Sequence, residues 1–91
     1  MVSRKVVISN PTGLHLRPAG LFCKAAAEFC CSVKFRTDKG ISSAKSVLSV
    51  LGACVKCGDE MEIICDGVDE EQALETMVAL GESGLGEEKK E

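Results

Sequence analysis

The chain has 91 residues, which is enough for one small domain and too few for two. Its only aromatic residues are three Phe, and its net charge is −3. A base-stacking nucleic-acid module and a basic surface for nucleic acid or anionic lipid are therefore both disfavoured. The single histidine excludes a multi-histidine metal site.

The distribution of apolar residues argues against membrane insertion. No stretch approaches the ~20 apolar residues of a membrane span. The basic start, residues 1–5, is followed by only three apolar residues before a polar turn at 9–11, too few for a secretory signal. We therefore expect a cytoplasmic protein, in which most of the six cysteines are small buried apolar residues.

The first third of the chain predicts a strand, a loop and a helix. Residues 2–8 largely alternate between apolar and polar, as expected for a strand with one wet face. Residues 10–13 contain proline and glycine and are expected to form a loop. A helix is predicted from Leu16, because Pro18 fits its first turn and apolar residues then recur at helical spacing as far as Cys30.

The middle of the chain predicts a hairpin and a short helix. Residues 32–36 alternate, residues 38–40 form a turn, and Ile41 opens a return strand. Residues 43–52 carry closely spaced aliphatic side chains and are expected to form a short helix.

The last third predicts a strand and a helix with a well-marked start. Residues 60–66 predict a strand with Met61, Ile63 and Cys65 on one face and Glu60 and Glu62 on the other. Asp69 suits an N-cap, and Gln72 completes a capping-box pattern with it. Val68 is placed to pack on Ala73 as a hydrophobic staple.

The predicted order is therefore β-α-β-β-α-β-α. The economical packing is an α+β fold, a two-layer open-faced β-sandwich with a four-stranded antiparallel sheet and three helices on one face. We expect one domain over residues 1–87 and a polar tail over residues 88–91.

His15 is the residue most suggestive of chemistry. It is predicted at, or one residue before, the start of the first helix, where unpaired amides and the helix dipole favour an anion. Arg17 adds a guanidinium whose fork matches phosphate oxygens. Both features disfavour the imidazolium, so a neutral, nucleophilic ring is expected near pH 7. The residues alone leave two interpretations open: a phosphoryl-accepting or anion-binding histidine, or a surface histidine that caps a helix.

Cys54 and Cys57 form a C-x-x-C pattern, which occurs in redox pairs and as half of zinc sites. The other cysteines do not form a second such pair. We therefore expect neither a metal nor a cofactor, and treat a small thiol-redox protein as a further alternative.

Two segments resemble a known family. Residues 10–19, NPTGLHLRPA, resemble the active-site segment of HPr, the histidine-containing phosphocarrier of the bacterial phosphoenolpyruvate-dependent sugar phosphotransferase system. Residues 45–48 resemble the regulatory-serine helix of the same family, and the resemblance extends over about residues 2–87. The sequence departs from the family at Leu16, where Ala is most common, and at Cys54, where Gly is usual.

The resemblance implies a phosphoryl carrier with a transient phosphohistidine rather than a free-standing catalyst. His15 would be phosphorylated on Nδ1 by Enzyme I, itself charged by phosphoenolpyruvate, and would pass the group to the IIA domain of a sugar transporter. Arg17 would stabilise phosphoryl charge, and the amides of Leu16 and Arg17 would cradle the phosphate, with no metal involved.

The resemblance also implies roles for residues around the second helix. Ser46 matches the site modified by HPr kinase/phosphorylase, the alternative being a plain helix-start serine. Val47, Leu48 and Leu51 would form an exposed contact patch for Enzyme I and the IIA partners, the alternative being that all three are core. Gly20 would leave a shallow spot on the same surface.

An alternative function is an HPr-like regulatory binding module. Such a module would act through Ser46 phosphorylation on a kinase or a transcription regulator, rather than by phosphoryl relay. In either case we expect a monomer.

Overall fold

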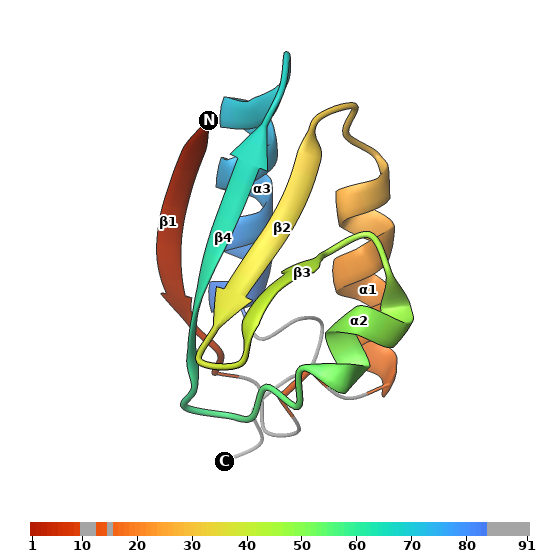
Figure 1. Cartoon of the computed structure of the whole chain (residues 1–91), viewed down its shortest axis with the longest axis vertical. Helices are drawn as coiled ribbons and strands as arrows, with labels where there is room; N and C mark the ends of the chain where they lie inside the picture. The colour runs from red at the N-terminus through yellow and green to blue at the C-terminus, as the bar shows by residue number, and fades with distance from the viewer. Residues whose placement is uncertain (10–12, 15, 84–91) are drawn as a thin grey trace.

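The computed structural model describes residues 1–9, 13–14 and 16–83. It confirms the predicted order of elements and the predicted fold class (Figure 1). The elements are β1 (Val2–Val7), α1 (Leu16–Ala27), β2 (Ser32–Thr37), β3 (Gly40–Ser43), α2 (Val47–Gly52), β4 (Glu60–Asp66) and α3 (Glu70–Glu82).

The four strands form one antiparallel sheet in the order β1-β4-β2-β3. Strand β4 lies between β1, where Val6 is opposite Met61, and β2, where Phe35 is opposite Ile63. Figure 1 shows α3 behind β4, and α3 contacts both β1 and β4. Helix α1 packs against α2 and α3, so the helices form one layer and the sheet the other.

The core lies between these two layers. Alternate residues of β2 and β4 point into it, as the sequence pattern predicted, and Phe35 of β2 and Phe22 of α1 are both fully buried. Their rings meet edge to face, with centroids 6.3 Å apart and an interplanar angle of 85°. This aromatic pair ties α1 to the sheet, and so holds the helix whose first residue follows His15.

Two helices are shorter than predicted. Helix α2 begins at Val47 rather than Ser43, because Ser43 is opposite Lys34 in the β2–β3 ladder. The next amide, of Ala44, also donates to the sheet, to the Val33 carbonyl at 2.9 Å. Helix α1 ends at Ala27 rather than near Cys30.

The start of α3 differs from the predicted capping box and staple. Asp69 occupies the N-cap position, but its side chain makes no cap hydrogen bond within α3. Its carboxylate instead accepts from the amides of Cys30 and Cys31, both at 2.8 Å. Val68 is 94% exposed, so it does not pack on Ala73 as a staple.

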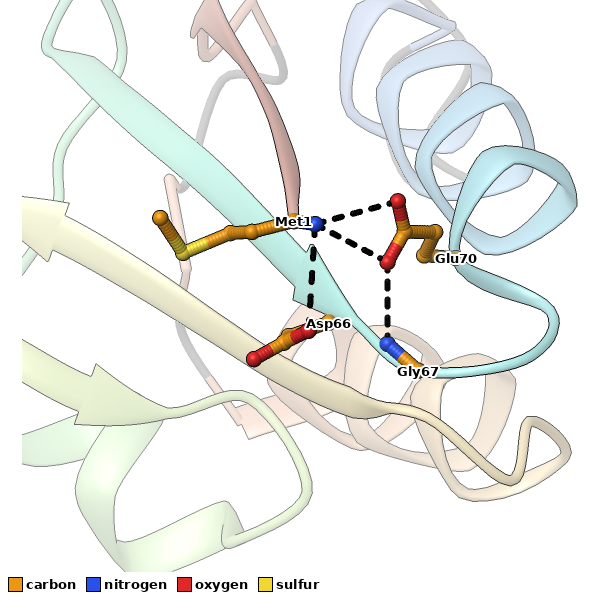
Figure 2. Close-up of polar contacts among 4 residues, drawn as sticks. All are labelled: Met1, Asp66, Gly67 and Glu70. Carbon is orange, nitrogen blue, oxygen red and sulfur yellow. Dashed lines mark hydrogen bonds and ion pairs between the residues drawn. The ribbon is translucent and has the colours of Figure 1, made fainter.

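Glu70 makes the local contacts at this helix start. Figure 2 shows its carboxylate between the Gly67 amide, which donates at 3.0 Å, and the Met1 ammonium group at 3.1 Å. The same ammonium lies 3.8 Å from the Asp66 carboxylate. The Gly67 bond, with the Met1 ammonium, lowers the pKa of Glu70 below its ordinary value. These contacts fix the start of β1 to the start of α3.

The six cysteines are free thiols and divide equally by burial. The prediction that most of them are buried is wrong, because only Cys23, Cys31 and Cys65 are buried, whereas Cys30, Cys54 and Cys57 are exposed. The predicted tail, 88–91, lies outside the described residues. In the part of the chain that the structure describes, no helix is both long and apolar enough to cross a membrane.

Candidate functional site

The candidate site lies at the N-terminal end of α1. His15 itself is outside the described residues, which include its chain neighbours Leu14 and Leu16. Leu14 is buried, whereas Leu16 and Arg17 at the start of α1 are exposed. No acidic residue occurs in the first turn of α1, so the unpaired amides and the positive end of the helix dipole are not neutralised there by a local carboxylate.

The connection between α2 and β4 supports this end of the molecule. We call residues 55–59 the bracing segment. The Val55 carbonyl accepts from the Leu14 amide at 2.9 Å. Further along, the Gly58 amide donates to the Ile8 carbonyl at 2.7 Å, and the Ile8 amide donates to the Asp59 carbonyl at 2.9 Å. The bracing segment is therefore bonded on both sides of the predicted loop at 10–13.

Gly13 shows how closely the bracing segment approaches. Its φ is +66°, and a Cβ added there would lie 2.7 Å from the Cα of Lys56. Any larger residue at this position would meet the backbone of the bracing segment in a strained conformation. The glycine predicted as a loop former is thus required by a contact with residues far along the chain.

An exposed apolar surface lies beside the start of α1. Leu16 on α1 is 65% exposed and Leu48 on α2 is 83% exposed, and Val47 is also exposed. The two helices pack against each other, and Figure 1 shows α2 beside the N-terminal half of α1. Exposed large aliphatic side chains on adjoining elements are typical of a protein contact surface. We call Leu16, Val47 and Leu48 the apolar patch.

Leu51 and Gly20 were also predicted to belong to this surface, and the structure places them differently. Leu51 is half-buried and packs against the core, so it does not share the exposure of Val47 and Leu48. Helical spacing does not separate these residues, because Leu51 lies one turn after Val47 on the same side of α2. The difference comes from the packing of Leu51 against the core. Gly20 is half-buried, and a Cβ added there would meet no atom within 4 Å, so open space lies beside it.

Ser46 is the N-cap of α2. Its Oγ accepts from the Ser49 amide at 3.2 Å, and the residue is half-buried. The side chain therefore caps the N-terminus of α2, as the helix-start interpretation predicts. The same position places the hydroxyl one residue before Val47 of the apolar patch.

The carboxylates with perturbed pKa values lie at the other end of α1. The amides of Cys30 and Cys31, which follow α1, lower the pKa of Asp69, with Cys30 the main cause. Glu70 is its neighbour at the start of α3. These two acidic groups are thus placed away from the end of α1 where an anion is expected.

The C-x-x-C pair shows no metal site. Cys57 Sγ donates to the Ser9 carbonyl at 3.7 Å, and Cys54 adopts a left-handed backbone with φ 54°. Across residues 1–9, 13–14 and 16–83, no three His, Cys, Asp or Glu side chains are grouped to hold a metal ion.

The bracing segment and the exposure of Leu16 were not predicted from the sequence. The bracing contacts join residues distant in the chain, and no local pattern signals them. The sequence contained one indication that Leu16 is exposed. A residue at a helix N-terminus next to an anion-binding histidine must face solvent or a partner.

Comparisons with known proteins agree on one family. The family model described as "PTS HPr component phosphorylation site" matches residues 2–83. A phosphocarrier protein HPr from Lysinibacillus sphaericus is 32% identical over 88 residues, covering 96% of this chain and all of the relative. An HPr-like protein Crh from Bacillus subtilis is 38% identical over 79 residues, covering 87% of this chain and 93% of the relative. The crystal structure of HPr-C-His from Thermoanaerobacter tengcongensis superposes with a TM-score of 0.93 at 36% identity, covering 98% of this chain and all of that one.

Proposed function

Because the chain belongs to the HPr family of phosphocarrier proteins, we propose that it accepts a phosphoryl group from Enzyme I on His15 and donates it to IIA domains of sugar transporters. The observation that carries the proposal is the exposed, acid-free start of α1 immediately after His15. There, Leu16 and Arg17 present backbone amides and a guanidinium to the phosphoryl group. No sugar contacts the carrier in this scheme, so sugar specificity belongs to the transporter.

The chemistry needs a nucleophile, charge stabilisation and exclusion of competing hydrolysis. The neutral His15 ring supplies the nucleophile at Nδ1, and the phosphoryl group passes from Enzyme I to that nitrogen. Arg17 and the first amides of α1 stabilise the phosphoryl oxygens in both transfers, which is the dominant contribution in phosphoryl transfer. The partner's surface closes over the apolar patch and shields the site from water.

The apolar patch is the proposed docking surface. Enzyme I and the IIA domains must each approach His15 from the same side, so they share Leu16, Val47 and Leu48 as contacts. The exposure of Leu16 and Leu48 supports this role, because neither contributes to the core. Gly20 leaves room on the same surface for a partner side chain.

Ser46 is the proposed regulatory site, modified by HPr kinase/phosphorylase. A phosphate on Oγ adds about −1.5 to −2 charge at pH 7. That charge sits next to Val47, so it weakens docking of partners on the apolar patch. The N-cap geometry supports the proposal, because a phosphate can replace the hydroxyl as acceptor for the Ser49 amide.

The second candidate is a regulatory binding module that acts through Ser46 on a kinase or transcription regulator. It is favoured by one observation, the 38% identity to the HPr-like protein Crh. The requirement for His15 distinguishes the two functions. Phosphoryl relay requires the imidazole of His15, whereas a module acting through Ser46 does not.

The distinguishing experiment is a two-stage transfer assay. Purified protein is incubated with Enzyme I and phosphoenolpyruvate, and a IIA domain is then added. We expect acid-labile phosphate to appear on the wild-type protein and then to move to the IIA domain. His15→Ala should abolish both stages, and Arg17→Ala should slow them roughly 10²-fold, as for loss of one charge-stabilising group. Ser46→Ala should relay normally; full relay by His15→Ala would refute the proposal.

We further propose that the protein acts as a cytoplasmic monomer. The described residues bury a continuous core within one chain, which supports folding without a partner copy. Sedimentation of the purified protein at several concentrations tests the monomer directly.

A further inference from the structure

Asp59 lies in the bracing segment and outside the apolar patch. We infer that Asp59 is a positioning residue for His15, which it influences through the bracing segment and Leu14. The inference rests on the proposed function of His15 as phosphoryl acceptor.

Asp59 closes the turn that gives the bracing segment its shape. Its Oδ2 accepts from the Lys56 amide at 3.0 Å, and its own amide donates to the Lys56 carbonyl at 2.9 Å. Its carbonyl accepts from the Ile8 amide at 2.9 Å. One residue thus locks the turn over 56–59 and fastens it to the end of β1. Substitution by alanine removes the side-chain bond and leaves the two backbone bonds in place.

The locked turn controls where the Val55 carbonyl points. The Val55 side chain is only 5% exposed and belongs to the core, so the residue is anchored on one side. On the other side its carbonyl accepts from the Leu14 amide at 2.9 Å. The close approach of Gly13 to Lys56 leaves no free space between the two segments. A shift of Lys56 is therefore passed on to Leu14, the residue before His15.

The rate of phosphoryl transfer depends on the position of the attacking nitrogen of His15 more than on the affinity for the partner. The attacking nitrogen must lie in line with the bond being broken, and a displacement of about 1 Å can cost roughly 10²-fold in rate. The apolar patch, which binds partners, is on α1 and α2 and makes no use of the Asp59 carboxylate. Loss of that carboxylate should therefore reduce the rate of transfer and leave docking unchanged.

The test compares Asp59→Ala with Asp59→Asn, which keeps an oxygen acceptor for the Lys56 amide. In phosphoryl transfer from Enzyme I, we expect Asp59→Ala to lower kcat roughly three- to tenfold, as for loss of one hydrogen bond, with KM unchanged. Hydrogen exchange at the Leu14 amide should accelerate by a similar factor. Asp59→Asn should restore both values to those of the wild-type protein.

Two controls separate positioning from general stability. Asp38→Ala removes an exposed carboxylate from the neighbouring β2–β3 turn and should change neither kcat nor Leu14 exchange. Val78→Ala, in the buried face of α3, lowers global stability without touching the bracing segment and should leave kcat unchanged. The inference is overturned if Asp59→Ala matches the wild-type protein, raises KM instead of lowering kcat, or behaves like Asp59→Asn. It is also overturned if Val78→Ala lowers kcat equally.

Failure of the proposed function would look different. If Enzyme I does not phosphorylate the wild-type protein, the carrier role is wrong. Leu14 exchange and the titration of the His15 ring by NMR in Asp59→Ala and Asp59→Asn still show whether Asp59 positions the histidine. Unchanged values in both would overturn the positioning role independently.

Discussion

Cys54 is the residue whose backbone least suits its side chain. Among the described residues it alone, apart from glycines, has a positive φ, at 54°. A left-handed conformation costs an L-residue about 1–2 kcal/mol, and replacing that residue with glycine removes this cost. Part of the gain is lost, because glycine has the larger conformational entropy in the unfolded state. The family resemblance implies Gly at this position, and the positive φ gives a physical reason for it.

We therefore expect Cys54→Gly to raise the free energy of unfolding by about 0.5–1 kcal/mol. Cys57→Gly is the matched control, because Cys57 is not in the left-handed region and should lose stability instead. Urea unfolding of the reduced proteins measures both. A loss of stability in Cys54→Gly comparable to that of the control would contradict this interpretation of the loop.

The thiols should divide into two reactivity classes. Burial raises the pKa of Cys31 to about 11, with its hydrogen bond to Asp69 as a further cause. Burial also raises the pKa values of Cys23 and Cys65. Because the thiolate is the reactive form, a disulfide reagent at pH 8 should modify the three exposed cysteines quickly and the three buried ones only on unfolding. Rapid modification of more than three thiols in the folded protein would show that burial does not protect the three buried cysteines.

At the scale of elements, one carboxylate adds hydrogen bonds between the end of α1 and the start of α3. Asp69 at the start of α3 accepts both amides that follow α1, and the Cys30 amide is the main cause of its lowered pKa. A carboxylate with a lowered pKa contributes stability above its ordinary value of 3.8, and that contribution is lost as the pH falls below it.

The free energy of unfolding should therefore fall as the pH drops below about 4. Asp69→Ala should be less stable at neutral pH and show a shallower decline on acidification. Glu75→Ala, on the exposed side of α3, serves as the control and should keep the wild-type slope. Chemical unfolding at a series of pH values measures the slopes, and equal slopes in all three proteins would rule out Asp69 as a cause.

Local pattern predicted some elements well and others poorly, for identifiable reasons. The strand at Glu60–Asp66 has the predicted core face, with Met61, Ile63 and Cys65 buried, because its opposite face is exposed or half-buried. The start of α2 was placed too early, because Ser43 is held by pairing with Lys34 in another strand. Asp69 has the sequence of a helix cap, yet its partners are backbone amides distant in the chain. The bracing segment escaped prediction for the same reason.

At the scale of the whole molecule, the two ends of α1 have different surroundings. Near its start lie the apolar patch and the bracing segment, and beyond its end lie Asp69 and the start of α3. The Phe22–Phe35 pair fixes the helix to the sheet between these ends. The motif around His15 could be found from the sequence, because it is contiguous. The patch needed the structure, since only burial separates Val47 and Leu48 from Leu51.

The most direct measurement is the location of the phosphoryl group after incubation with Enzyme I and phosphoenolpyruvate. Mass spectrometry under alkaline conditions, which preserve phosphohistidine, locates the group on the chain. The proposed function predicts one phosphoryl group on His15, none on Ser46, and none at all in His15→Ala. A phosphoryl group on Ser46 or on another residue, or an unmodified wild-type protein, would contradict it.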